Sequence, residues 1–230
     1  MKVALCISGQ PRYLEEGYAH INKNILQKYS PDVFVHTWWD NSMSNKRMEL
    51  PATLSYGRTY YWKDDTIDVI KKIYKPAIFL YEPQIVFDTF NDVNYELARP
   101  SNVHSMFFSI QRSNQLKMQY EKENSFLYDI VIRCRFDIEI IKFDIDLYNL
   151  SMDYVNCYAM KESPNSDLAI SSSKNMDIYS SLYDNFKKYK QDGWKQFVGE
   201  GLVKHHLNKN NISWDNPVIR NKLINSIIIK

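Results

Sequence analysis

The sequence predicts an α/β protein whose mostly parallel central sheet is flanked by helices and followed by a mixed C-terminal part. Apolar, β-branched runs alternate with segments of helical periodicity, and several of these runs end abruptly in polar residues. The clearest run lies in Tyr128–Glu139, which reads Y-D-I-V-I-R-C-R-F-D-I-E. Apolar runs of this kind suit strands that are buried on both faces. Charges at the carboxyl ends of such strands fall where open α/β sheets bind ligands.

The chain opens with a strand, a helix and a second strand. Lys2–Ser8 is apolar, and Gly9 allows a tight turn before a helix with apolar spacing over Leu14–Tyr29. Pro31 ends that helix, and Asp32–Trp38 has the pattern of the second strand. Because connections are short and crossovers are right-handed, we expect the two strands to be parallel.

A surface excursion over 41–62 separates this unit from the next helix. That helix covers Asp64–Tyr74 and begins with acidic residues, which the positive end of a helix dipole favours. Ala77–Tyr81 is the third predicted strand. A long helix then follows over Ser101–Asn124, with Ser101 as its N-cap, and the fourth strand begins at Tyr128.

The C-terminal part mixes both kinds of element. Strands are predicted at Tyr154–Met160 and Asp167–Ile170, and helices at Asn175–Tyr189 and Gly193–Leu207. Ile212–Trp214 has the pattern of a short strand, and 218–229 suits either a docking helix or a strand. The chain contains no internal repeat or clear linker, and its 230 residues fit a single domain.

Composition excludes several classes of partner. The net charge of +2 gives no reason to expect nucleic acid or an anionic membrane as a partner. The 3 cysteines lie in strand-like runs without a C-x-x-C pair, which indicates a reducing compartment. No stretch approaches the ~20 apolar residues of a membrane span. We therefore expect a cytoplasmic protein without a transmembrane segment.

Several common catalytic motifs are missing. The chain has no G-x-G-x-x-G, no G-x-x-x-x-G-K-[ST], no H-E-x-x-H and no G-x-S-x-G. These absences weaken the dehydrogenase, kinase, metalloprotease and α/β-hydrolase readings. The candidate chemistry therefore rests on the polar clusters that follow predicted strands and helices.

Two such clusters follow the first and second strands. Residues 8–12 (Ser8, Gly9, Gln10 and Arg12 among them) combine a turn with free N–H groups and a guanidinium, which together suit phosphate oxygens. A solvated surface turn explains this segment equally well. After the second strand, Trp38 or Trp39 is a candidate to cover a base or sugar, and Asp40 is a candidate to accept its hydroxyls. Thr37 is counted with Trp38 among the nucleotide-binding residues, whereas His36 has the pattern of a core residue.

The third cluster ends the fourth strand. Strand alternation places Arg133, Arg135 and Asp137 on one face. Arginine and carboxylate together can bind a nucleotide diphosphate, the carboxylate directly or through a hard divalent cation. A simple Arg–Asp ion pair is the alternative. The abrupt change from apolar to charged residues favours a functional site.

The remaining clusters lie further along the chain. In the segment 162–167, Asp167 can contact the hydroxyls of an acceptor. Glu200 is a candidate general base, and His205 or His206 a candidate ligand of a metal or phosphate. The two histidines are adjacent and point to different faces of a helix, so at most one is expected to serve. The alternative is an ordinary helix surface.

Several segments, in order along most of the chain, carry a resemblance to a known family. They are I-S-G-Q-P-R at 7–12, D-V-F-V-H-T-W at 32–38, Y-D-I-V-I-R-C-R-F-D-I at 128–138, S-D-L-A-I-S-S-S-K-N-M-D-I-Y at 166–179 and G-E-G-L-V-K-H-H-L at 199–207. In these segments the chain resembles small glycosyltransferases with a GT-A-like, Rossmann-like fold. That family occurs in large DNA viruses and in bacterial surface-polysaccharide clusters.

The resemblance implies transfer of a sugar from a nucleotide-diphosphate sugar to a hydroxyl of a glycan or glycoside acceptor. It also implies a nucleotide-binding half over 1–140 and an acceptor-binding half over 141–230. The expected location is the cytoplasm, which would be the host cytoplasm for a viral protein. The donor sugar, the acceptor and the oligomeric state stay open.

The same resemblance assigns roles to site residues. Arg12 and Arg135 would hold the diphosphate. Arg135-Phe136-Asp137 stands at the family's D-x-D position, so arginine replaces one of the two usual carboxylates. We expect Asp137 to bind Mn²⁺ or Mg²⁺, and Asp167 or Glu200 to deprotonate the acceptor.

Two other functions compete with this one. A nucleotide-sugar or glycan-binding domain without catalysis would explain the replaced carboxylate. A metal-dependent nucleotidyl- or phosphotransferase usually gathers several carboxylates around paired ions. Since the fourth strand offers only Asp137 and the more distant Glu139, this last reading ranks below the other two.

Overall fold

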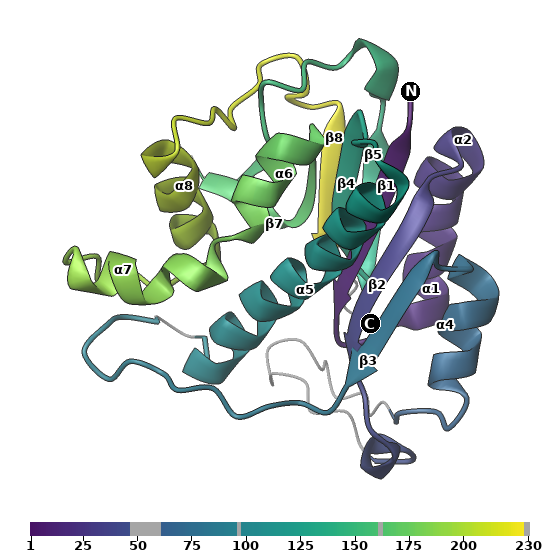
Figure 1. Ribbon diagram of the computed structural model, residues 1–230, viewed down its shortest axis with the longest axis horizontal. Coiled ribbons are helices and arrows are strands. Elements are labelled where there is room, and N and C mark those ends of the chain that lie inside the picture. Colours follow the sequence, from purple (N-terminus) through teal and green to yellow (C-terminus); the bar gives the residue numbers. More distant parts are fainter. Residues whose placement is uncertain (47–60, 96–97, 161–162, 228–230) are drawn as a thin grey trace.

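The computed structural model describes residues 1–46, 61–95, 98–160 and 163–227. Its centre is a six-stranded sheet with the strand order β3-β2-β1-β4-β7-β6 (Figure 1). The parallel strands are β1 (Val3–Gly9), β2 (Asp32–Trp38), β3 (Ile78–Glu82) and β4 (Ile130–Arg135). β7 (Ser163–Ser171) runs antiparallel to β4, and β6 (Asn156–Met160) runs antiparallel to β7. The predicted α/β class with a mostly parallel sheet is confirmed.

The order of the strands reverses next to β1. The chain passes from β1 to β2 and β3 on one side and then places β4 on the other side of β1. In this register Ser8 of β1 lies beside Arg135 of β4. A reversal of this kind opens a crevice outside the carboxyl ends of the two strands, where α/β sheets bind ligands. The topology therefore points to the segment after Gly9 and the segment after Arg135.

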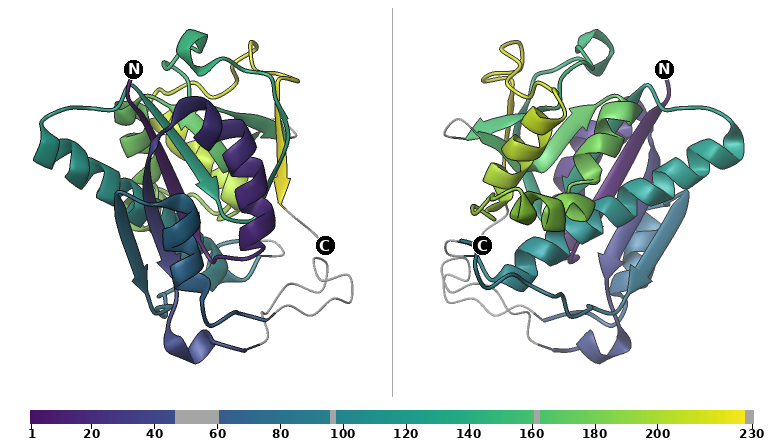
Figure 2. Two further views of the ribbon diagram at one scale, coloured as in Figure 1. Left: turned by 90° about the vertical axis from the view of Figure 1, so that its right-hand side faces the viewer. Right: turned by 60° about the vertical axis from the view of Figure 1, so that its left-hand side comes forward.

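Helices cover both faces of the sheet (Figure 2). One face carries α1 (Leu14–Ile21), a π-helical turn (Asn22–Leu26), α2 (Gln27–Tyr29) and α4 (Thr66–Tyr74). The other face carries α5 (Pro100–Asn124), α6 (Ser173–Ser180), α7 (Phe186–Gln191) and α8 (Gly199–Lys209). Because alternate side chains of a strand point to opposite faces, β1 contributes Leu5 and Ile7 to the first core and Ala4 and Cys6 to the second. None of the described helices has the length and apolar character needed to cross a membrane.

A second, two-stranded sheet packs on the α1 side. It pairs β5 (Ile138–Phe143) with β8 (Leu223–Ile227) in antiparallel register. Ile138, Phe143 and Leu223 join the core beneath α1. The chain therefore turns sharply after β4 and runs back as β5, a change of direction that the continuous pattern of Tyr128–Glu139 did not predict.

Other boundaries also differ from the sequence-based expectation. The helix predicted over Asn175–Tyr189 is interrupted by a 3-10 turn at Tyr183–Asn185, near which the Ser181 hydroxyl donates to the Ile178 carbonyl. The helix predicted from Gly193 begins only at Gly199. For 218–229, the strand alternative is correct over Leu223–Ile227. The predicted strand at 212–214 is a single bridge between Ser213 and Tyr154. Much of the 41–62 excursion, residues 47–60, lies outside the described residues.

Gly17 of α1 lies directly against the turn that follows β4. A Cβ atom at Gly17 would stand 1.7 Å from the Phe136 carbonyl oxygen. We expect Gly17→Ala to lower the free energy of unfolding by about 1–3 kcal/mol, because backbone atoms have to move apart. Gly201→Ala is the matched control, since nothing lies within 4 Å of its Cβ position and alanine favours the helix. Urea denaturation of both variants checks this, and an unchanged Gly17→Ala midpoint would contradict the close contact.

Candidate functional site

The loop after β1 is held in one conformation. Gly9 has a φ of 111°, a backbone conformation that favours glycine. The Thr37 hydroxyl at the end of β2 donates to the Gly9 carbonyl at 2.8 Å, and the Arg12 backbone N–H donates to the Gln10 carbonyl at 2.9 Å. Thr37 therefore fixes the loop that carries Arg12.

Asp137 is the centre of the site. Its Oδ1 and Oδ2 accept from Arg135 Nε at 2.7 Å and Nη2 at 2.9 Å, which is bidentate pairing. Arg12 Nη2 lies 3.0 Å from Asp137 Oδ2. Strand alternation predicted that Asp137 would lie on the fourth strand beside Arg135. The structure corrects this, because β4 ends at Arg135 and Asp137 lies in the turn between β4 and β5. The turn nevertheless keeps its side chain close to Arg135.

Charge pairing controls the protonation of this group. Burial raises the pKa of Asp137, but the two guanidiniums outweigh burial and hold that pKa below its usual value. Burial also lowers the pKa of Arg135, and the Asp137 carboxylate reverses this to a raised pKa. Burial leaves the pKa of Arg12 below its usual value despite Asp137. The Asp137 carboxylate is therefore ionised at neutral pH, and guanidiniums stay protonated in proteins.

Two further carboxylates border this group. Asp167 Oδ1 on β7 lies 3.5 Å from Arg135 Nη1, and the Asp167 backbone N–H donates to Asn165 Oδ1 at 2.6 Å. In the first turn of α8, Glu200 Oε1 accepts from the Ser166 hydroxyl at 3.4 Å. Burial, followed by the charge of Asp167, raises the pKa of Glu200. A raised pKa brings a carboxylate closer to the range in which a general base works.

Arg133 is the least compensated charge of the site. It is 1% exposed, and its Nε and Nη1 have no hydrogen-bond partner in the described part of the chain. None of the ion pairs among the described residues includes it, and burial lowers its pKa. Among the residues that the structure describes, the buried hydroxyls of Ser8 and of Tyr179 on α6 also have no hydrogen-bond partner. A buried, unpaired guanidinium is costly, and an anion that pairs with it would offset that cost.

The donor set at Asp137 does not fit a divalent cation as it is arranged here. Both oxygens of Asp137 already accept from guanidiniums, and these positive charges oppose a second cation. Over the described ranges, no group of three or more His, Cys, Asp or Glu side chains comes together as a metal site. The expected binding of a metal ion by Asp137 and His205 stays a prediction. In this arrangement, Arg12 and Arg135 neutralise the negative charge of the Asp137 carboxylate.

Two candidates are packed in aromatic surroundings. The His205 ring stacks on Trp194, with 3.9 Å between centroids, and Tyr189 meets its edge. Trp38 is 1% exposed and stacks on Phe108, 5.5 Å away. In the described structure, neither His205 nor Trp38 contacts Arg12, Arg135 or Asp137, so their predicted roles as ligands of a metal or nucleotide stay predictions.

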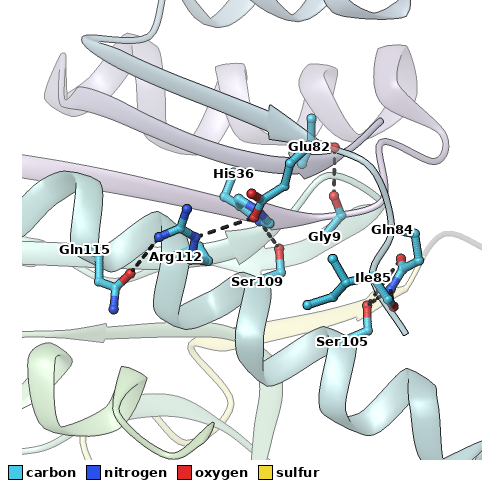
Figure 3. Close-up of polar contacts among 10 residues, drawn as sticks. Gly9, His36, Glu82, Gln84, Ile85, Ser105, Ser109, Arg112 and Gln115 are labelled. Carbon is cyan, nitrogen blue, oxygen red and sulfur yellow. Dashed lines mark hydrogen bonds and ion pairs between the residues drawn. The ribbon is translucent and has the colours of Figure 1, made fainter. Parts of the chain in front are cut away.

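His36 is a core residue, as its sequence position indicated (Figure 3). Its Nε2 donates to Glu82 Oε1 at 2.9 Å, so its Nδ1 accepts from the Ser109 hydroxyl at 2.7 Å. Burial lowers the pKa of His36 to about 4, and the ring is neutral at pH 7. Arg112 Nε lies 3.5 Å from the same Glu82 oxygen. This chain of polar contacts ties α5 to the ends of β2 and β3.

Sequence reasoning missed several contributors. Ser166 and Asn165 position Glu200 and Asp167, and Tyr179 lies near Arg133. Ser166 and Tyr179 both fall in the motif at 166–179, but no role was assigned to either, and Tyr179 has the helical spacing of an ordinary core aromatic. Glu162, at the start of the predicted fourth cluster, lies outside the described residues.

The structure thus joins residues from five places in the chain: the loop after β1, the end of β4, the β4–β5 turn, β7 and the start of α8. Together they form a partly buried cluster in which three guanidiniums lie among three carboxylates, namely Arg12, Arg133 and Arg135 with Asp137, Asp167 and Glu200. Comparison with protein-family models and with curated proteins gives no match.

Proposed function

We propose that this chain is a glycosyltransferase of GT-A-like fold, which moves a sugar from a nucleotide-diphosphate sugar to a hydroxyl acceptor in glycan synthesis. The observation that carries the proposal is Arg133, a buried guanidinium without an ion pair in the described residues, beside Arg135 and Arg12. Three arginines at a topological switch point suit a diphosphate, because guanidiniums bind phosphate oxygens bidentately.

The division of roles follows from charge. When the glycosidic bond to the donor breaks, negative charge develops on the leaving nucleotide diphosphate. Arg12, Arg133 and Arg135 are fixed donors that would stabilise this charge as it forms. The loop of Ser8, Gly9 and Gln10 would border the phosphates with its backbone.

Glu200 is the better candidate for the base that deprotonates the acceptor hydroxyl. Burial raises its pKa, which makes the carboxylate a stronger base than an exposed glutamate. Asp167 lies within 3.5 Å of Arg135, which ties it to the diphosphate side of the site. We therefore assign Asp167 to positioning of Arg135 and of the transferred sugar.

One observation favours a non-catalytic nucleotide-sugar-binding domain as the second candidate. The carboxylate at the D-x-D position, Asp137, is fully engaged by Arg135 and Arg12. Such a domain would bind the donor without releasing its nucleotide. This difference separates the two candidates experimentally.

The test is a thermal-shift screen of the full chain against UDP-, GDP- and dTDP-sugars, with and without Mn²⁺. Binding to the native state raises the melting temperature by mass action. Release of free nucleotide from a stabilising sugar, faster with glycan acceptors, supports transfer. Stabilisation without release supports the binding domain. If no nucleotide sugar stabilises the protein under either condition, the proposed function is wrong.

A further inference from the structure

A cavity of about 650 Å³ lies beside the edge strand β6, outside the group around Asp137. Tyr158 and its neighbours on β6 form one wall, and Lys204 of α8 forms another. Residues of the segment between α8 and β8 (Figure 1), from Trp214 to Leu223, line the remaining side. Ligand pockets in proteins range from roughly 300 to 1,000 Å³, so this cavity is of a suitable size.

The lining combines flat apolar rings with planar polar groups. Trp214 and Tyr158 are both half-buried and border the cavity. Asp215 and Arg220 form a bidentate ion pair on its border, and Asn221 adds an amide. Aromatic rings pack against the apolar C–H face of a pyranose, while carboxylates, guanidiniums and amides hydrogen-bond its hydroxyls. This chemistry suits a saccharide.

The wall is fixed before any ligand arrives. Asn216 is 3% exposed, and its amide donates to Asn156 Oδ1 at 2.7 Å. Its own Oδ1 accepts from the Val218 backbone N–H at 3.0 Å. Lys204 Nζ lies 5.7 Å from the centre of the Trp214 ring, which helps to orient the indole. A preformed wall lowers the entropic cost of binding.

The cavity continues the candidate catalytic site in two ways. Lys204 follows Glu200 by one helical turn on α8, so both side chains lie on one face about 6 Å apart along the axis. β6 also pairs with β7, the strand that carries Asp167. A chain of sugar rings in the cavity would therefore extend toward Glu200 and Asp167.

We propose that this cavity binds an oligosaccharide, which presents a terminal hydroxyl to Glu200 as the acceptor of the transferred sugar. The role of the saccharide as acceptor rests on the proposed glycosyltransferase function. The binding of a saccharide is argued from the cavity lining alone. Trp214 is the residue on which binding depends most, because it supplies the largest flat surface.

The test is a titration of the full chain with maltotriose, chitotriose, mannotriose and trigalacturonic acid, in which saturation-transfer NMR measures binding of each trisaccharide. We expect at least one trisaccharide to bind, and Trp214→Ala to weaken it about tenfold, as loss of one stacking ring predicts. Trp214→Phe, which keeps a ring, should retain most of the affinity. Tyr148→Ala is the control, since this exposed tyrosine lies outside the cavity lining.

The proposal and the proposed function fail in different ways. If none of the four trisaccharides binds, or if Trp214→Ala binds as well as the wild type, the saccharide cavity is wrong even when nucleotide sugars bind. If a trisaccharide binds through Trp214 while no nucleotide sugar does, the cavity is supported and the transferase is not. UDP and GDP titrations of the same variants separate these results, because Trp214→Ala should leave nucleotide affinity unchanged.

Discussion

Replacing Arg133 by methionine should make the protein more stable and should weaken its binding of nucleotide diphosphates. The guanidinium is buried with two nitrogens unpaired, so its removal relieves a desolvation cost that no carboxylate offsets in the described structure. We expect the free energy of unfolding to rise by about 1–4 kcal/mol, the range found when buried charges are replaced by apolar groups of similar volume.

The same substitution should weaken binding of UDP or GDP by about tenfold to a hundredfold. A hydrogen bond to a charged group contributes about 1.5–3 kcal/mol, and a buried guanidinium offers more than one such bond. Urea denaturation gives the first quantity and isothermal titration calorimetry gives the second. Opposite signs for stability and binding are the signature of a residue that the fold keeps for a ligand.

Arg112→Met is the matched control for this experiment. Arg112 is also an arginine over the α5 face of the sheet, but it is partly exposed and lies near Glu82. We expect its loss to change stability by less than about 1 kcal/mol and to leave UDP affinity unchanged. If Arg133→Met destabilises the protein and binds UDP normally, Arg133 is structural and the anion site is wrong.

Sequence patterns predicted the parallel half of the fold well. Apolar runs such as Lys2–Ser8 and Asp32–Trp38 are buried on both faces, so their hydrophobicity is continuous and their boundaries are sharp. The carboxyl ends of such strands share one edge of the sheet. For this reason the sequence pattern alone was enough to predict that Arg12 lies near Arg135 and Asp137.

The direction of the later strands was not predictable in the same way. The reversal from β4 into β5, which belong to different sheets, depends on a turn at Phe136-Asp137 that contains neither glycine nor proline. What permits it is remote in sequence: Gly17 of α1, whose missing side chain makes room for the Phe136 carbonyl. Pairing of β5 with β8, about 80 residues later, likewise depends on tertiary contacts rather than on local pattern.

The candidate site shows the same limit. Residue types identified the charged groups, but not which charges would be paired. Asp137 and Arg135 form a bidentate pair, whereas Arg133, two residues earlier along β4, has no ion-pair partner in the described ranges. The distinction depends on where β7 and α6 place Asp167 and Tyr179, which a single sequence does not show.

Asp137→Asn should be the most damaging single change in the site. The buried carboxylate lies between the Arg12 and Arg135 guanidiniums, and removing its charge leaves two partly buried cations close together. Breaking a buried pair by removing one partner costs about 3–5 kcal/mol, and we expect a loss in this range in urea denaturation. Asp144→Asn, which makes the same change in an exposed pair with Lys142, should cost less than about 1 kcal/mol.

Added nucleotide diphosphate then distinguishes the arginine site from a metal site. If the arginines hold the ligand, UDP or GDP replaces the missing negative charge, and the ligand raises the melting temperature of Asp137→Asn more than that of the wild type. If Asp137 instead serves as a cation ligand, the wild type needs Mn²⁺ to bind nucleotide, and the variant loses both the Mn²⁺ effect and the nucleotide effect. The pairing of both Asp137 oxygens with guanidiniums leads us to expect the first result.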